Sequence, residues 1–356
     1  MKLNKSLVGI GFRRCNADYS IYYIQKDTTK IIILVYIDDL VLLSNNLFYL
    51  EEIKKTLGET FAMKDMGEIS SYLGIGIKRD RKNRSISLNQ LKYIEDILKK
   101  YGMEDVALIS TPMDVNLKLT KEMCPKTQEE VEEMKRIPYQ SVIGSLMYCM
   151  LRTRPDIAFP VGALSQYNTN YGKPHWIAVK RILWYLQATK HLQLTYISPT
   201  GLLGYCDADY GGDTDDRRSF SGFAFMFAGG AVSWSSKKQR TVALSSTEAE
   251  YMAVTQAAKE ATWFRRLLKE IKHFVDDTPT TIFEDNQGCI ALAKNPAYHA
   301  KTKHIDIQHH FIREKVEDKE IDLVYCKTED MIADMLTKPV TRDKLQKFCN
   351  GLGLRL

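Results

Sequence analysis

Residues 244–264, LSSTEAEYMAVTQAAKEATWF, predict a long helix that carries a charged residue on its apolar face. Ser246 and Thr247 are good N-cap residues, and the helical pattern continues to about residue 271. Steps of three and four residues from Glu250 meet an apolar row, namely Ala253, Val254, Ala257, Ala258, Ala261 and Phe264. The same steps from Glu248 meet Tyr251, Met252, Thr255, Gln256, Lys259 and Thr262. Glu250 therefore faces the core, and Glu248 leans toward solvent.

Strand patterns lie on both sides of this helix. Three precede it, at residues 202–206, 219–227 and 231–236, and the last two are joined by the tight turn Ala228-Gly229-Gly230. Two follow it, at residues 280–284 and 322–326, and they alternate with short helices at 287–294, 306–315 and 331–337. Three sequential strands, a helix, and then alternating strands and helices predict a mixed five-stranded α/β sheet with helices against it.

Three further acids stand at strand ends or on a helix in this last third of the chain. Asp207 follows the first strand, Asp285 follows the fourth, and Asp334 lies on the final short helix. With Glu250 they would repel one another and take up protons unless divalent cations neutralise them. Oxygen-only ligands suit magnesium or manganese, and two such ions ~3.5–4 Å apart serve in-line phosphodiester chemistry. From spacing alone, an acid that caps a helix or faces water stays an alternative for each member, and Asp209 and Glu248 are close substitutes.

The front of the chain has an α+β pattern. The apolar run 31–43 is broken only by Asp38 and Asp39, which predicts a buried hairpin with two acids at its tip. A short helix is expected at 51–57, a hairpin at 74–88, and helices at 90–102, 141–151, 160–168 and 176–188, with a connector at 110–138. The turn of the second hairpin holds five basic residues between 78 and 84, which suits either contact with a nucleic acid backbone or simple solubility.

Six motifs of the last third carry a resemblance in their residues, order and spacing. They are GYCDADYGGD (204–213), SWSSKKQ (233–239), LSSTEAEY (244–251), EDNQ (284–287), TKHID (302–306) and ADMLTK (333–338). This set resembles the ribonuclease H domain of copia-type LTR retrotransposon polyproteins. The resemblance implies the ribonuclease H fold and two-magnesium hydrolysis of RNA in an RNA–DNA hybrid, with manganese able to substitute. It assigns metal binding and catalysis to Asp207, Glu250, Asp285 and Asp334, with one ion activating the attacking water and the other stabilising the leaving 3′ oxygen.

The front of the chain resembles the same polyproteins. The motifs are YIDDL (36–40), KDMG (64–67), YLG (72–74), YQSVIGSLMY (139–148) and TRPDIA (153–158). The first resembles the reverse transcriptase palm hairpin, so Asp38 and Asp39 would be the metal-binding, catalytic aspartates of a remnant polymerase site. The next two resemble the end of the palm, and the last two resemble the thumb-to-connection region.

These resemblances predict a division of the chain into four parts. Residues 1–110 would be a partial palm with the start of the thumb, 111–200 a connector with the helical thumb/connection region, 201–340 the ribonuclease H-like domain, and 341–356 a tail. The family's polymerase needs a third aspartate on an earlier palm strand, and Asp18 and Asp27 lack the sequence that surrounds it. We expect a polyprotein piece that keeps ribonuclease H activity and has lost autonomous polymerase activity by N-terminal truncation. The alternatives are a non-catalytic nucleic-acid-binding remnant and a poorly folded relic.

Candidate nucleic-acid contacts flank the four acids. Lys237, Lys238 and Arg240 precede the helix of Glu250. Asn286 and Gln287 follow Asp285, where they could donate to 2′-hydroxyl groups. His304 resembles a family position between the third and fourth acids and could shuttle protons, with an ordinary surface histidine as the alternative. The implied partners are an RNA–DNA hybrid and primer-template nucleic acid, and a dimer with a complete polymerase subunit stays open.

Composition excludes several classes of protein. Fifty Lys and Arg against 44 Asp and Glu leave a formal charge of +6, which permits a polyanionic partner without demanding one. The longest apolar stretches, 31–37 and 142–151, fall short of the ~18–20 residues of a membrane span. No apolar segment typical of a signal peptide follows the first residues, and the seven scattered cysteines argue against a disulfide scaffold. We expect a location in the cytoplasm, including virus-like particles, or in the nucleus.

Overall fold

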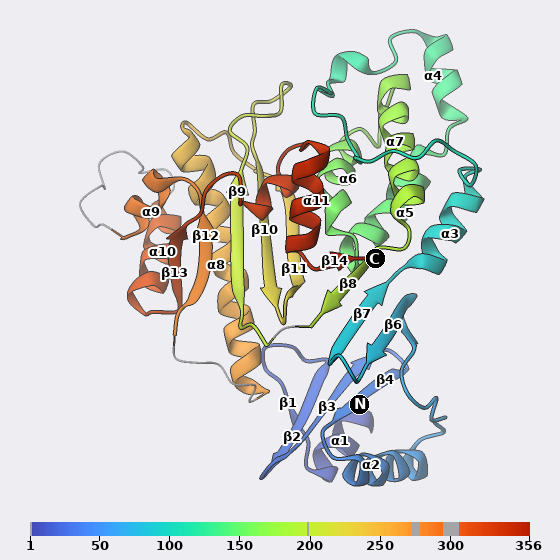
Figure 1. Ribbon diagram of the computed structural model, residues 1–356, viewed down its shortest axis with the longest axis vertical. Coiled ribbons are helices and arrows are strands. Elements are labelled where there is room, and N and C mark those ends of the chain that lie inside the picture. The colour runs from blue at the N-terminus through green and yellow to red at the C-terminus, as the bar shows by residue number, and fades with distance from the viewer. Residues whose placement is uncertain (1, 198, 272–277, 295–305) are drawn as a thin grey trace. The chain divides into compact units, whose positions relative to one another are not determined.

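The computed structural model describes residues 2–197, 199–271, 278–294 and 306–356 (Figure 1). These form two compact units, Met1–Ile69 with Glu260–Pro279, and Ser70–Lys259 with Thr280–Leu356. The four-part division expected from the sequence stays a prediction. None of the helices in the described ranges has the length and apolar character that a membrane span requires.

The first unit is built on an antiparallel four-stranded sheet in the order β1-β2-β3-β4. Its elements are α1 (Lys2–Ile10), β1 (Arg13–Arg14), β2 (Ile21–Lys26), β3 (Thr29–Tyr36), β4 (Asp39–Ser44) and α2 (Leu47–Thr60). Strand alternation buries Ile31 and Ile33 on β3, and α2 packs Ile53 and Leu57 into the same core. The side chain of Asn46 caps α2 by accepting from the Tyr49 amide at 3.2 Å.

The predicted hairpin at residues 31–43 is confirmed as β3 and β4, but the prediction that it is buried is wrong for its second strand. No residue of β4 is buried. The reason is that β4 lies at the edge of the sheet and pairs only with β3. The first unit also takes the end of α8 (Ser246–Glu270), where the Trp263 indole donates to the Ala17 carbonyl at 3.0 Å.

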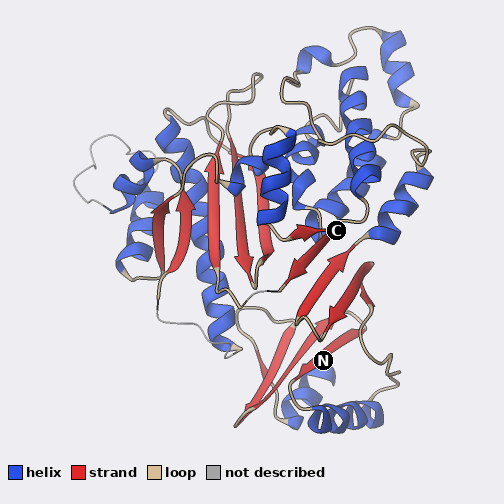
Figure 2. Ribbon diagram, viewed as in Figure 1, coloured by secondary structure: helices blue, strands red, loops and turns tan. Residues whose placement is uncertain are grey.

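The second unit contains a five-stranded antiparallel sheet and a group of helices (Figure 2). The strand order is β14 (Leu354–Arg355), β8 (Gln193–Tyr196), β7 (Ser85–Asn89), β6 (Ile75–Asp80) and β5 (Ser71–Tyr72). The helices are α3 (Leu91–Lys100), α4 (Gln128–Lys135), α5 (Tyr139–Arg152), α6 (Ala158–Ser165) and α7 (Lys173–Thr189). The expected hairpin at 74–88 and the expected helices at 90–102, 141–151, 160–168 and 176–188 are therefore present, with shifted ends.

The helical core encloses a buried ion pair. Arg154 and Asp156 are both fully buried, and their side chains meet at 2.6 Å. The Tyr185 hydroxyl donates to the same carboxylate at 2.7 Å. Burying two charges is tolerated here because each is hydrogen-bonded as well as paired.

The predicted mixed five-stranded sheet is confirmed in the same unit. Its order is β11 (Gly230–Lys238), β10 (Phe220–Phe227), β9 (Leu203–Ala208), β12 (Thr280–Glu284) and β13 (Ile321–Tyr325). Strands β9, β10 and β11 are antiparallel, whereas β12 is parallel to both β9 and β13. This arrangement is the ribonuclease H-like fold that the sequence predicts. Helices α8, α9 (Gln287–Lys294), α10 (Asp306–Glu317) and α11 (Arg342–Gly351) accompany the sheet (Figure 1).

Two features of this region fix where acids can gather. The alanine row of α8 is buried, with Ala253, Ala257, Ala258 and Ala261 at most 1% exposed. The helix expected at 331–337 is a short 3₁₀ helix, Ile332–Leu336. The sequence Thr337-Lys338-Pro339 explains its shortness, because the residue before proline avoids the helical backbone conformation.

Candidate active site

The four acids selected from the sequence lie together at one edge of the mixed sheet. Asp207 is near the end of β9, and Asp285 directly follows β12. Because β9 and β12 are parallel neighbours, their carboxyl ends meet at this edge. Glu250 comes from the first turns of α8, and Asp334 comes from the 3₁₀ helix. Four separate elements therefore deliver one carboxylate each.

The carboxylates form two groups of three that share one member. Ligand oxygens of Asp207, Asp285 and Asp334 lie within 4.8 Å of one another. Oxygens of Glu250, Glu284 and Asp285 meet the same limit. We call these the aspartate triad and the glutamate triad. Glu284 was not among the acids selected from the sequence.

Burial raises the pKa of three acids of the two triads, Asp207, Glu250 and Glu284. Asp207 is 2% exposed, Glu250 is 6% exposed, and Glu284 and Asp334 are fully buried. Desolvation raises the pKa of Asp207 to about 6 and the pKa of Glu284 to about 8. Desolvation, and then the nearby Glu284 carboxylate, raise the pKa of Glu250 to about 11. Proximity and burial thus make the ionised form of these carboxyl groups costly.

Lysines offset the charge of the aspartate triad. The Lys338 ammonium lies 2.8 Å from Asp334 Oδ1 and 3.8 Å from Asp207 Oδ2, and Lys344 lies 3.7 Å from Asp334 Oδ2. The Thr337 hydroxyl donates to Asp207 Oδ2. Neither Lys338 nor Thr337 was selected from the sequence, although Lys338 follows Asp334 at a helical spacing of four residues.

The donor set fits a divalent cation such as magnesium. Every candidate ligand atom is a carboxylate oxygen, which is what hard cations prefer. Glu250 Oε2 is buried without a hydrogen-bond partner in the described part of the chain. An orphaned buried oxygen in such a cluster is a position that a cation would satisfy.

The two substitutes considered from the sequence are used elsewhere. Asp209 Oδ1 accepts from the Phe220 amide, which ties the start of the β9–β10 loop to β10. Glu248 Oε2 accepts from the Leu244 amide at 2.8 Å, at the start of α8. Neither belongs to a triad of candidate ligands in the described ranges. Helical spacing thus chose the acid of α8 that lies in the cluster, but the prediction that Glu248 leans toward solvent is wrong. Glu248 is only 4% exposed, because its carboxylate folds back to the Leu244 amide.

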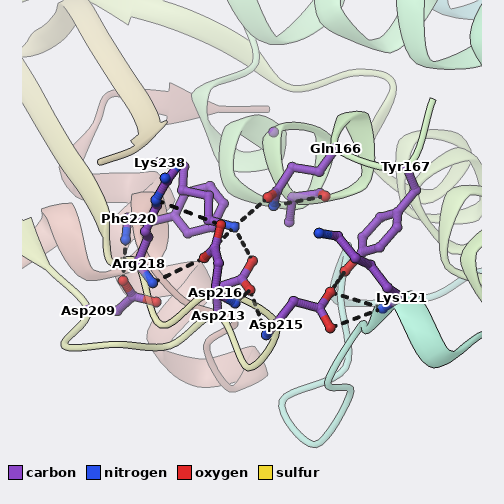
Figure 3. Close-up of polar contacts among 12 residues, drawn as sticks. Lys121, Gln166, Tyr167, Asp209, Asp213, Asp215, Asp216, Arg218, Phe220 and Lys238 are labelled. Carbon is purple, nitrogen blue, oxygen red and sulfur yellow. Dashed lines mark hydrogen bonds and ion pairs between the residues drawn. The ribbon is translucent and has the colours of Figure 1, made fainter. Parts of the chain in front are cut away.

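Lys238, a predicted nucleic-acid contact, is held by protein groups (Figure 3). Its ammonium lies 2.5 Å from Asp213 Oδ2 and 2.9 Å from Asp216 Oδ1, and it donates to Gln166 Oε1 at 2.8 Å. These contacts join the end of β11 to the β9–β10 loop and to α6. The loop is also held by Asp215, which accepts from the Lys121 amide at 2.9 Å. Lys238 is thus an anchor of this loop, and its role toward nucleic acid stays a prediction.

The other predicted nucleic-acid contacts lie at different places. Lys237, Arg240 and Gln287 are exposed. Asn286 Oδ1 accepts from the Cys289 amide at 2.9 Å and so caps α9, which leaves its side-chain NH₂ group as a donor. His304 lies outside the described residues.

The predicted polymerase aspartates occupy a different kind of place. Asp38 lies in the exposed turn between β3 and β4, next to Ile37 with a positive φ of 54°, and Asp39 is the exposed first residue of β4. In the described part of the chain, neither belongs to a group of three candidate metal ligands.

Comparison with known proteins identifies the family. A family model described as reverse transcriptase (RNA-dependent DNA polymerase) matches residues 1–115. The Pol polyprotein from transposon TNT 1-94 of Nicotiana tabacum is 41% identical over 99% of this chain and 28% of its own length. The putative transposon Ty5-1 protein of Saccharomyces cerevisiae is 31% identical over 72% of this chain and 82% of its own length. The chain belongs to the copia-type retrotransposon Pol polyproteins.

Three Pol polyproteins match 99% of this chain, but the chain spans only about a quarter of their own length. A solved structure, LC11-RNase H1, is 17% identical and covers 41% of this chain and 96% of its own, with a TM-score of 0.31. The strand order of the mixed sheet, and not this overlap, carries the assignment of the fold.

Proposed function

We propose that the ribonuclease H-like region of this chain hydrolyses the RNA strand of RNA–DNA hybrids with two divalent cations. The observation that carries the proposal is the pair of carboxylate triads joined at Asp285. Two oxygen-rich sites that share a ligand suit the two-ion arrangement of phosphodiester hydrolysis. Membership of the copia-type Pol polyproteins supports an RNA–DNA hybrid as the substrate.

Each residue of the site has a separate role in the proposed reaction. Asp207, Asp285 and Asp334 would hold one ion, and Glu250 with Asp285 would hold the other. When bound, magnesium or manganese would supply an activated water and charge stabilisation at the leaving 3′ oxygen. Thr337 and Lys338 hold the Asp207 and Asp334 carboxylates in place. The side-chain NH₂ group of Asn286, a hydrogen-bond donor, and the exposed Gln287 are suited to 2′-hydroxyl groups, which distinguish RNA from DNA.

The backbone of the hybrid would be bound by exposed cations near the site. Lys237 is exposed near the end of β11, and Arg240 is exposed two residues after that strand. Each phosphate that they neutralise would release counterions, so binding should weaken as salt increases.

The experiment is cleavage of a labelled RNA–DNA hybrid by the purified chain with magnesium and then manganese. Asp285→Asn should lower the rate at least ~100-fold, because a shared ligand of both ions is lost and several kcal/mol of transition-state stabilisation go with it. Asp322→Asn is the matched control, since Asp322 lies on the neighbouring β13, is half exposed and pairs with Lys294. A folded chain that binds the hybrid without cleaving it would leave a non-catalytic binding remnant.

For the front of the chain we propose that primer extension does not occur with this chain alone. The exposed Asp38–Asp39 turn lacks a third carboxylate among the described neighbours, so it offers an ion little beyond what solvent offers. A primer-extension assay with a labelled template tests this point, and nucleotide incorporation that Asp38→Asn abolishes would contradict it. Size-exclusion chromatography of this chain mixed with a complete polymerase subunit would test whether the two form a dimer.

A further inference from the structure

Glu284 is the first residue of the motif EDNQ, but it was not among the acids selected from the sequence as metal ligands. It is the last residue of β12, and it shares the buried face of that strand with Thr280 and Ile282. Its side chain is fully buried. One of its oxygens lies within 4.8 Å of oxygens from both Glu250 and Asp285.

The two triads differ in how their negative charge is offset. Lys338 and Lys344 contact the aspartate triad. No ion pair found in the described ranges involves Glu250 or Glu284. Two buried carboxyl groups at this separation need a proton or a cation between them, because an uncompensated buried charge costs several kcal/mol.

Hydrogen bonds orient Glu284 without using up its oxygens. Its Oε1 accepts from the Asn286 amide at 3.0 Å, and its Oε2 accepts from the Cys206 thiol at 3.2 Å. A carboxylate has about four acceptor positions, so both oxygens keep capacity for another partner. Across from it, Glu250 Oε2 is buried and has no partner in the part of the chain that is described. This orphaned oxygen is independent evidence that the glutamate triad is built around a cation.

We infer that Glu284 is the third carboxylate ligand of the second divalent ion, together with Glu250 and Asp285. The inference rests on the proposed two-ion function and extends it to a fifth acid. It gives each ion three protein carboxylates, with Asp285 common to both.

The test is manganese binding to the full chain, measured by calorimetry and by the electron paramagnetic resonance signal of free manganese. The unmodified chain should bind two ions. Glu284→Gln keeps the side-chain length and an acceptor for the Asn286 amide, and it should weaken one of the two ions at least ~10-fold while the other is unchanged. Asp322→Asn, which removes a half-exposed acid from the adjacent strand, should bind both ions as the unmodified chain does.

The outcomes separate this inference from the proposed function. Two ions bound equally well by Glu284→Gln and by the unmodified chain would overturn the role of Glu284 and leave the two-ion proposal standing. An unmodified chain that binds no manganese would overturn both. If Glu284→Gln does not fold, crystals of the unmodified chain soaked in manganese decide the matter. Anomalous density ~2.2 Å from a Glu284 oxygen supports the inference, and an ion without that bond refutes it.

Discussion

Two places in this molecule were expected to bind catalytic metals, and their physical surroundings differ. Asp38 and Asp39 are exposed neighbours at the tip of one hairpin of the first unit. In the second unit, five carboxylates converge from β9, α8, β12 with the residue after it, and the 3₁₀ helix, and four of them are buried. Water solvates acids in an exposed turn at little cost, whereas acids buried together demand a counter-charge. Convergence and burial, more than the presence of paired acids, therefore distinguish a candidate metal site from an ordinary acidic turn.

The largest expected effect separates the two places by activity. Asp207→Asn should reduce hybrid cleavage at least ~100-fold, because it removes a ligand of the aspartate triad. The double variant Asp38→Asn with Asp39→Asn should cleave at the unmodified rate. Both are measured under single-turnover conditions with magnesium. A double variant that lost cleavage would break the distinction between the two places.

The next effect is a pH dependence of stability that belongs to the buried acids. The pKa of Glu284 is about 8 in the folded chain and 4.5 as its ordinary value, so the folded chain binds this proton more tightly. The stability that this group contributes is therefore present below pH ~4.5 and is lost as the pH rises toward 8. We expect a loss on the order of 2–4 kcal/mol in the unfolding free energy, with Glu250 adding in the same direction.

Urea denaturation at several pH values with EDTA measures this loss. Magnesium should restore stability at pH 8, because an ion then replaces the proton. The unfolding free energy of Glu284→Gln should fall less steeply with pH than that of the unmodified chain. Equal pH dependence of the unfolding free energy in the two chains would contradict this explanation.

A smaller effect distinguishes a structural lysine from an exposed one. Lys238→Met should destabilise the chain by about 1–3 kcal/mol, because Asp213 and Asp216 lose a charged partner in a largely buried cluster (Figure 3). Lys237→Met should change stability by less than ~0.5 kcal/mol and should instead reduce the salt dependence of hybrid binding by about one ion. Thermal denaturation and binding titrations in different salt concentrations provide the two readings. The reverse pattern would assign the nucleic-acid contact to Lys238.

The smallest effect concerns the exposed turn itself. Replacing Asp38 and Asp39 by asparagine should change the unfolding free energy by less than ~0.5 kcal/mol, because exposed acids outside a cluster contribute little. Urea denaturation of the double variant measures this value. A loss of several kcal/mol would contradict this prediction, because it would mean that the two carboxylates make stabilising contacts that the structure does not contain.

Much of the candidate site could be predicted from the sequence because the relevant signals are local. The period of 3.6 residues placed Glu250 on the alanine row of α8, and strand ends selected Asp207 and Asp285. Glu284 was missed because the interpretation followed the acid after the strand, although alternation with Ile282 could have found it. Lys238 was expected to face nucleic acid because a sequence shows a charge without showing its partners.

The sequence by itself determined most of the longer elements, the strand and helix periods, and the family, because each depends on residues close together in the chain. It did not predict α1, β8 or the helix α4 within the expected connector. Only the tertiary structure decided that the carboxylates form two triads joined at Asp285. It likewise decided that lysines form ion pairs with Asp207 and Asp334 of the aspartate triad. It also decided that Lys238 anchors a loop and that β4 lies at an exposed edge. These are distances between distant parts of the chain, and they arise from the order in which parallel and antiparallel strands pair.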